Sequence, residues 1–206
     1  MSQIPPITFG AMILAAGRSS RMGQPKMLLP WGKTSVLGHS LSQWQRLGIA
    51  QLVVVHGPDS EVVRELDRLK LPAEQRIKNA VPEEGMFSSI RCAAQWEGWS
   101  KHLTHWAIVL GDQPQVREET LEALVQFASN HAESICQPEW KGRPKHPVVL
   151  PKKAFLELRS TEAADLKEFL TSRAIALIKL NDSGLDFDLD YPDDYERAKR
   201  LYFGTG

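Results

Sequence analysis

Short apolar runs alternate with amphipathic stretches along most of this chain. Apolar runs of about four to eight residues are typical of buried strands, and they predict strands at residues 8–15, 52–55, 106–110, 134–137, 147–150 and 175–180. Apolar positions three and four residues apart are typical of helices, and they predict helices at residues 34–47, 61–70, 85–96, 117–130 and 192–202. Apolar strands that alternate with helices indicate an α/β fold, in which helices cover both faces of a parallel sheet.

Composition narrows the class of protein. The chain has 206 residues, of which 42% are hydrophobic and 24% are charged, as in ordinary soluble globular proteins. This length favours one domain over residues 1–206, with residues 1–8 expected to form a flexible tail. The 25 basic and 25 acidic residues balance, which argues against nucleic acid as a partner but leaves a mononucleotide open.

The expected location is the cytoplasm. Cys92 and Cys136 are the only cysteines, and neither belongs to a zinc-type pattern, so free thiols in a reducing compartment are expected. The first ten residues lack the charged and apolar segments of a signal peptide. No apolar run approaches the length of a membrane span, so no membrane partner is expected.

The first predicted strand leads into a loop of small and positively charged residues. Ligands bind beyond the carboxyl ends of strands in parallel sheets, and small side chains at Ala15, Ala16 and Gly17 would let a ligand approach the main chain. Arg21 and Lys26 supply positive charge where phosphates would lie. The same residues would also suit a strand-to-helix turn with solvated cations.

Two common phosphate-binding motifs do not fit this region. Gly32, Lys33 and Thr34 could end a P-loop, but Met27 stands where that motif needs its first glycine. A dinucleotide-binding G-x-G-x-x-G motif is also absent, because the glycine after Gly17 is Gly23. Neither motif is therefore present in this region.

The segment LAAGRSSRMGQPK, at residues 14–26, resembles the amino-terminal signature of molybdenum cofactor cytidylyltransferases and their MobA-like relatives. The resemblance implies a Rossmann-like, three-layer α/β/α nucleotidyltransferase fold with a mostly parallel sheet. It also implies that the loop surrounds the triphosphate of an NTP. The residues assigned to the nucleotide in this segment are Leu14, Ala15, Ala16, Gly17, Arg21 and Lys26.

Carboxylates follow the later strands. Asp112 comes directly after the strand at 106–110 and could either hold Mg²⁺ or cap the helix that begins near Arg117. Asp186, Asp188 and Asp190 alternate before the last helix, and in an extended chain they would share one face. The GDQP sequence at 111–114 and the acidic ending resemble the family, which implies Asp112 and Asp190 as metal ligands, with Asp188 next.

Further blocks match the family less completely. The resemblance assigns Asn79, Gly85, Ser88 and Ser89 to the nucleotide, although these residues could simply cap a helix. It places Gln113, Pro114 and His146 on the acceptor side. Lys145 replaces a glycine of the family pattern, and residues 160–166 depart from it. Trp31, in the loop after the signature, is expected to be exposed to ligand.

The implied function is a Mg²⁺-dependent enzyme that transfers a nucleotidyl group from an NTP to a small phosphorylated acceptor. Lys26, Arg21 and Asp112 are the expected catalytic residues. CTP is the preferred nucleotide because the chain has Leu-Ala-Ala-Gly where the guanylyl branch has Leu-Ala-Gly-Gly. The implied acceptor is molybdopterin, and a molybdoenzyme or its chaperone is a candidate protein partner. Two alternatives remain, namely a transferase acting on a sugar or other alcohol phosphate, and a non-catalytic protein that binds nucleotide or cofactor.

Overall fold

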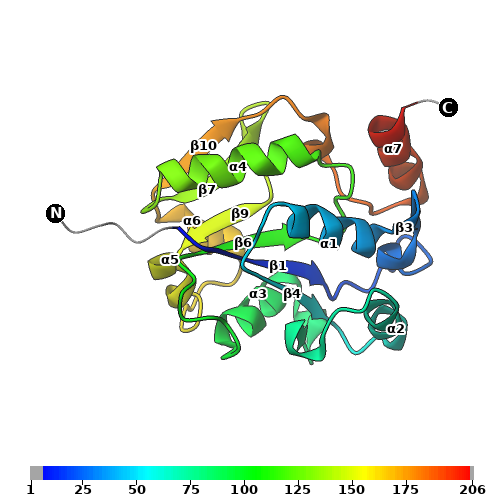
Figure 1. The fold of residues 1–206 in the computed structure, drawn as a ribbon, viewed down its shortest axis with the longest axis horizontal. Coiled ribbons are helices and arrows are strands. Elements are labelled where there is room, and N and C mark those ends of the chain that lie inside the picture. Colours follow the sequence, from blue (N-terminus) through cyan, green and yellow to red (C-terminus); the bar gives the residue numbers. More distant parts are fainter. Residues whose placement is uncertain (1–6, 205–206) are drawn as a thin grey trace.

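A mixed sheet lies at the centre of the computed structural model, which describes residues 7–204 (Figure 1). The strand order is β10-β7-β9-β6-β1-β4-β5, and β8 pairs with the last two residues of β7. Its strands are β1 (Phe9–Ala15), β4 (Gln51–His56), β5 (Arg76–Lys78), β6 (His105–Leu110), β7 (Ile135–Trp140), β8 (Arg143–Pro144), β9 (Val148–Pro151) and β10 (Ile175–Lys179). Among the long strands only β9 runs antiparallel to its neighbours, which confirms the mostly parallel sheet.

Helices cover both faces of the sheet, as the alternating pattern predicts. Helices α1 (Val36–Arg46), α2 (Ser60–Arg68) and α4 (Glu118–Asn130) pack on one face. Helices α3 (Met86–Gln95), α5 (Lys152–Glu157) and α6 (Leu166–Thr171) pack on the other. Successive side chains of a strand point to opposite faces, so Ile13 joins the first of these cores and Met12 joins the second. The three-layer α/β/α architecture is therefore present.

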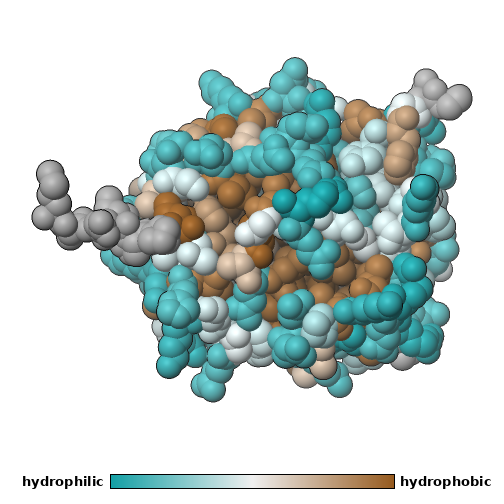
Figure 2. Space-filling view, in the orientation of Figure 1, coloured by the Kyte–Doolittle hydropathy of each residue, from teal (hydrophilic) through white to brown (hydrophobic). Residues whose placement is uncertain are grey.

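The helices present polar residues to solvent. Figure 2 shows hydrophilic residues along the outer surfaces of the front helices and hydrophobic residues between them, where the helices meet the sheet. None of the helices within residues 7–204 is long and apolar enough to cross a membrane.

Helix α7 (Pro192–Phe203) lies beyond the carboxyl end of β1, beside the small hairpin of β2 (Pro30–Trp31) and β3 (Thr34–Ser35) (Figure 1). A third, smaller core joins these elements and includes Trp31, which is only 1% exposed. The Trp31 ring lies 5.5 Å from that of Tyr202 and 5.2 Å from that of Phe203. The expectation that Trp31 faces a ligand is wrong, because helix α7 covers it.

Some element boundaries differ from the pattern-based ones. The first helix begins at Val36 because Thr34 and Ser35 pair with β2, and the Ser35 hydroxyl accepts the Gly38 N–H at 3.0 Å as the N-cap. The short elements β5, α5 and α6 were not predicted. The expected tail over residues 1–8 falls mostly outside the described residues, but Thr8 is held by the fold, since its N–H donates to the Thr104 hydroxyl at 2.9 Å.

Asp182 holds the start of helix α4 in place. Its buried carboxylate, only 2% exposed, accepts hydrogen bonds from the Arg117 and Gly184 N–H groups and from the Thr120 hydroxyl, at 2.9, 2.9 and 2.7 Å. The helix-cap role that Asp112 could have filled therefore belongs to Asp182, which directly precedes the 3₁₀ turn at Ser183–Asp186 and is the N-cap of that turn.

We expect Asp182→Ala to lower the free energy of unfolding by about 2–4 kcal/mol, because three donors lose a buried charged acceptor. Urea unfolding at pH 7.5 measures this change. The exposed Glu162→Ala variant is the control and should shift the free energy by less than about 0.5 kcal/mol. An Asp182→Ala protein as stable as this control would contradict the capping role.

Candidate active site

The loop after β1 forms one wall of a cavity at the carboxyl ends of β1 and β4. Ala15, Ala16 and Gly17 line this space of about 400 Å³ together with Gly57 and Pro58. A Cβ atom on Gly57 would lie 3.3 Å from the Ala16 carbonyl oxygen, so a larger residue would crowd the two loops. The cavity presents main chain and small side chains, as binding of a nucleotide close to the backbone requires.

Lys26 lies at the centre of the charged cluster beside this loop. It begins the 3₁₀ turn Lys26–Leu28, and its N–H donates to the Ser19 hydroxyl at 3.0 Å, which closes the loop. The Lys26 Nζ atom donates to Asp112 Oδ2 at 2.5 Å and to Asp190 Oδ1 at 3.2 Å. Burial alone would lower the pKa of Lys26, but Asp112 and then Asp190 outweigh it and raise the pKa above its ordinary value. The lysine is therefore held in its charged form.

Arg21 completes the cluster from the same loop. Its Nη1 atom donates to Asp190 Oδ2 at 2.8 Å, so Asp190 bridges the two cations predicted for the phosphates. Asp112 reaches the cluster from the end of β6, next to β1 in the sheet. The fold thus brings together Arg21, Lys26, Asp112 and Asp190.

Asp188 adds a third carboxylate. Gln113 Nε2 donates to Asp188 Oδ1 at 2.7 Å. Burial and the charge of Asp112 raise the pKa of Asp188, against the opposing effects of the Gln113 hydrogen bond and the Lys26 charge. Negative charge is therefore in excess at this point of the cluster.

These carboxylates fit a divalent cation that arrives with phosphate. Asp112 and Asp190 both lie within hydrogen-bond distance of a single atom, Lys26 Nζ, so they face a common point. Magnesium is usually held by one or two carboxylates together with phosphate oxygens and water. Within residues 7–204 no group of three or more acidic, histidine or cysteine side chains is arranged to hold a metal alone. A metal here would depend on the nucleotide for its remaining ligands.

The third aspartate of the acidic run does not join the cluster. Residues 183–186 form a 3₁₀ turn, so the expectation that Asp186, Asp188 and Asp190 share one face is wrong for Asp186. Its carboxylate instead accepts from Lys145 Nζ at 3.1 Å, and this hydrogen bond lowers the pKa of Asp186.

We expect Asp188→Asn to raise the free energy of unfolding of the ligand-free protein by about 0.5–2 kcal/mol, because it removes a partly buried charge next to Asp112. A carboxyl whose pKa is raised by folding gives stability only as the pH falls through that folded pKa. At pH 7.5 the ionised Asp188 carboxylate therefore lowers the free energy of unfolding. The variant should also lack the gain in stability that Asp188 gives as the pH falls through its raised pKa. Urea unfolding between pH 4 and pH 8 measures both effects.

Asp186→Asn is the matched control, and we expect it to change the free energy of unfolding in the opposite direction. The pKa of Asp186 is lowered, so its ion pair gives stability above the unfolded pKa, and loss of that pair should destabilise the protein at pH 7.5. If Asp188→Asn also lowered the free energy of unfolding, the prediction would be wrong. The Gln113 hydrogen bond and the Lys26 charge would then stabilise the Asp188 carboxylate by more than its burial and the Asp112 charge cost.

Asn79 hydrogen-bonds to both Ser88 and Ser89. Asn79 Nδ2 donates to both serine hydroxyls, at 2.8 and 3.0 Å, while its Oδ1 accepts the Val81 N–H at 2.9 Å. Gly85 precedes helix α3 with φ of 93°. In the ligand-free chain this block fastens the loop after β5 to the start of α3, beside a second cavity of about 440 Å³ lined by Asn79 and Ser88.

The residues assigned to the acceptor have different surroundings. Gln113 points to Asp188, and Pro114 is buried. His146 precedes β9, and its burial lowers its pKa to about 4, so the ring is neutral at physiological pH. It lines a different cavity of about 620 Å³, between the sheet and α6.

Several cavity residues were missed from the sequence. Arg18, Gly57, Pro58, Asp59 and Pro82 line the space next to Ala16. Gly57 and Pro58 directly follow the buried strand β4, so the reasoning applied to the loop after β1 would have found them. Arg18 directly follows Gly17 in the loop after β1, so the same reasoning would also have found it, whereas no comparable pattern marks Pro82. Leu14 does not line this space, and its carbonyl accepts the Gly111 N–H at 3.1 Å.

Several known proteins are similar to this chain in sequence or in architecture. The molybdenum cofactor cytidylyltransferase of Escherichia coli (strain K12) is 24% identical over 194 residues, which cover 93% of this chain and 95% of that protein. The crystal structure of Rv0371c from Mycobacterium tuberculosis H37Rv is 25% identical with a TM-score of 0.73, covering 96% of this chain and 100% of that chain. Another structure of Rv0371c is a complex with manganese. A nucleotidyl transferase from Methanothermobacter shares the fold, with a TM-score of 0.78 at 18% identity over 97% of this chain and 99% of its own.

The family model described as the MobA-like NTP transferase domain matches residues 11–176. This range includes the loop with Arg21 and Lys26, as well as Asp112 at the end of β6, and it stops before Asp188 and Asp190. The chain belongs to the MobA-like NTP transferase family.

Proposed function

We propose that this protein transfers a nucleotidyl group, preferably CMP from CTP, to a phosphorylated acceptor of the molybdopterin type and releases pyrophosphate. The observation that carries the proposal is the position of Lys26 Nζ between Asp112 and Asp190, next to the loop of Ala15, Ala16 and Gly17. Fixed cations and carboxylates of this kind suit a triphosphate that binds together with a divalent cation.

The protein groups have distinct roles in this proposal. The acceptor phosphate oxygen attacks the α-phosphorus, and the bond from that phosphorus to the pyrophosphate oxygen breaks. Lys26 and Arg21 neutralise the negative charge that grows on the departing pyrophosphate. A phosphate monoester is already largely ionised at neutral pH, so no general base is needed. Catalysis then rests mainly on positioning and electrostatics.

Asp112 and Asp190 would hold the metal, with Asp188 close by. When bound, Mg²⁺ would neutralise charge on the phosphate oxygens and orient the triphosphate. In the ligand-free chain Lys26 and Arg21 occupy the same carboxylates. Nucleotide and metal should therefore bind together, since pairing of Lys26 and Arg21 with the phosphates would leave Asp112 and Asp190 free to hold the metal. The manganese complex of Rv0371c supports a divalent metal without deciding which one is used here.

The nucleotide preference rests on residues 14–17. The chain has two alanines before Gly17, as in the cytidylyl branch of the family, and the curated relative with this activity matches over nearly the whole chain. The small cavity beside Ala16 would receive the base and ribose. The cytoplasm, where NTPs are found, is the compartment that suits this role.

Pyrophosphate release tests the proposal. The purified protein is incubated with each of the four NTPs, Mg²⁺ or Mn²⁺, and molybdopterin, and pyrophosphate is measured by a coupled assay. We expect release with CTP above that with GTP, and only when metal and acceptor are both present. Calorimetry should show metal-dependent binding of CTP.

The two alternatives give different results in the same assay. A transferase for sugar or other alcohol phosphates would release pyrophosphate with such an acceptor and not with molybdopterin. A non-catalytic binding protein would bind CTP in the calorimeter and release no pyrophosphate with any acceptor. Either result would replace the proposed reaction.

A further inference from the structure

The proposed metal ligands come from two distant parts of the chain. Asp112 follows strand β6, whereas Asp188 and Asp190 belong to the acidic segment, residues 183–190, between β10 and α7. Within the described chain this segment contains the 3₁₀ turn Ser183–Asp186 and no strand, so pairing in the sheet does not set its position. Hydrogen bonds to the loop that carries Asp112 must therefore bring the carboxylates together.

Gln115, in the same loop as Asp112, supplies two of these hydrogen bonds. Its side chain is buried, and its Nε2 atom donates to the Gly184 carbonyl at 2.9 Å and to the Phe187 carbonyl at 2.6 Å. Carbonyl oxygens only accept, so the NH₂ side of the amide must face them. The Oε1 atom accepts no hydrogen bond from any residue between 7 and 204. The hydrogen bonds of this side-chain amide therefore all go to the acidic segment.

The main chain of the acidic segment also approaches this loop closely. A Cβ atom on Gly184 would lie 2.5 Å from the Gln115 carbonyl oxygen, closer than a real Cβ atom comes. Nearer the charged cluster, the Leu189 N–H donates to the Asp112 carbonyl at 3.1 Å. The segment is thus held against the loop near both of its ends, and Leu189 stands between the two aspartates that face the cluster.

Charge alone would not hold the acidic segment in place once nucleotide is bound. In the ligand-free chain Arg21 and Lys26 both pair with Asp190. In the proposed complex these cations pair with the phosphates, and until a metal ion binds, the carboxylates of Asp112 and Asp190 repel each other. The hydrogen bonds from Gln115 involve neither cation and would remain.

We propose, on the basis of the metal-assisted transfer proposed above, that Gln115 is a positioning residue for the metal site. It holds the acidic segment against the loop of Asp112, so that Asp112 and Asp190 face one ion while the phosphates occupy the cations. Gln115 itself touches neither the metal nor the substrate, and it acts through the two carbonyls that it binds.

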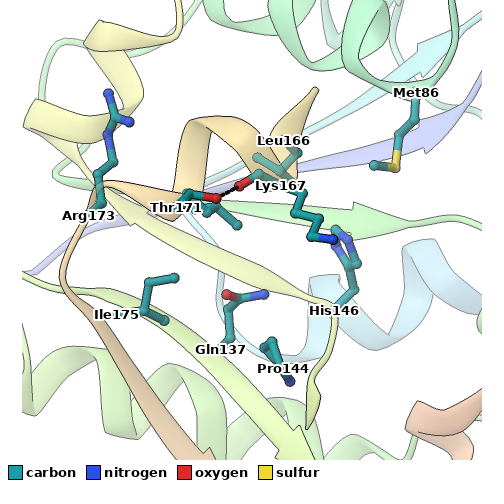
Figure 3. Close-up of a pocket in the computed structure, with 10 residues that line it drawn as sticks. Met86, Gln137, Pro144, His146, Leu166, Lys167, Thr171, Arg173 and Ile175 are labelled. Carbon is teal, nitrogen blue, oxygen red and sulfur yellow. Dashed lines mark hydrogen bonds between the residues drawn. The ribbon is translucent and has the colours of Figure 1, made fainter. Parts of the chain in front are cut away.

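This contact lies on the other face of the sheet from the cavity shown in Figure 3. Leu185 of the acidic segment and Val116, next to Gln115, belong to the core under α1, α2 and α4. Leu166 and Leu170, which line that cavity, belong to the core under α3, α5 and α6. A change at Gln115 therefore reaches the charged cluster without altering the residues that line the cavity.

The Gln115→Met variant tests the proposal, because methionine has nearly the same length and cannot donate a hydrogen bond. Calorimetry on the full chain gives the dissociation constant of CTP in EDTA and in saturating Mg²⁺, and the ratio of the first to the second is the metal enhancement. We expect this ratio to fall about tenfold, the scale of losing two hydrogen bonds. Affinity for CTP in EDTA should stay the same, since Arg21 and Lys26 are unaltered. A metal enhancement as large as in the unaltered protein would overturn the proposal.

Gln43→Met is the matched control. Gln43 is also buried, and its Nε2 atom donates to the Val116 carbonyl at 2.8 Å, so it holds the residue after Gln115 to helix α1 and not to the acidic segment. Both variants should lower the melting temperature, but Gln43→Met should keep the metal enhancement within about twofold. An equal fall in the two variants would show a general loosening of the loop and would overturn the positioning role.

Gly184→Ala reaches the same contact from the opposite side and serves if Gln115→Met does not fold. Its added Cβ atom would press on the Gln115 carbonyl oxygen and move the acidic segment away from the loop. We expect the same fall in metal enhancement. An unchanged metal enhancement in Gly184→Ala would overturn the proposal.

The unaltered protein separates this inference from the proposed function. CTP binding that neither Mg²⁺ nor Mn²⁺ strengthens would overturn the proposed metal-assisted transfer and the role of Gln115 with it. A metal enhancement that is present in the unaltered protein and persists in Gln115→Met would overturn the inference alone and leave the proposed function standing.

Discussion

The Asp112→Asn variant is expected to lose at least about 10³-fold in kcat/KM, roughly 4 kcal/mol of transition-state stabilisation. The proposed metal site would lose one of its two charged ligands, and the amide would still fit the same space. Lys26 would keep its contact with Asp190, so the cluster should remain assembled. The initial rate of pyrophosphate release over a range of CTP concentrations measures the loss, and circular dichroism with thermal unfolding shows whether the fold is intact.

Asp186→Asn is a suitable control for this loss. It removes an aspartate from the same acidic segment as Asp190, but one that pairs with Lys145 outside the cluster. Its activity should stay within about twofold of the unaltered protein. Full turnover by Asp112→Asn at ordinary Mg²⁺ concentration would refute the metal assignment.

Lys26→Ala is expected to cost about 2–4 kcal/mol in transition-state stabilisation, or about 30- to 10³-fold in rate, the scale of losing one preorganised charge partner. The loss should appear mainly in kcat, because charge on the bridging oxygen grows as the bond breaks. Lys26 is only 9% exposed, so its interaction with phosphate would be little screened by water. Steady-state kinetics with varied CTP separates kcat from KM.

Lys33→Ala controls for the loss of a positive charge. Lys33 is exposed in the turn between β2 and β3, seven residues from Lys26, and should leave both kinetic constants nearly unchanged. A Lys26→Ala protein with normal kcat and a raised KM would make Lys26 a residue of ground-state binding. Lys26→Ala also leaves Asp112 without the cation that it contacts. The melting temperatures of this variant and of the unaltered protein must therefore be compared in the same experiment.

Most long elements could be predicted because their apolar periodicity is strong. The strands near residues 8–15 and 106–110 are buried on both faces and read as continuous apolar runs. Elements β5, α5 and α6 have only three to six residues, too few for a period to show. The position of Trp31 could not be predicted, since helix α7 covers it from more than 150 residues away in the sequence.

The sequence predicted those residues of the candidate site that lie just beyond the carboxyl ends of strands. Lys26 and Asp112 lie beyond the ends of adjacent strands β1 and β6, so topology alone brings them near each other. The 3₁₀ turn that removes Asp186 from the cluster depends on Asp182 accepting hydrogen bonds from Arg117 and Gly184, a tertiary arrangement without a local pattern.

The ion pair between Arg21 and Asp190 joins positions 169 residues apart. A ribosome releases the amino-terminal loop first, so the nascent chain carries Arg21 and Lys26 long before Asp190 is synthesised. Until then the strands of the sheet can already pair, but the two cations have only Asp112 to balance them. Products of premature termination or proteolysis that lack Asp190 should therefore keep much of the sheet and yet fail to close the charged cluster.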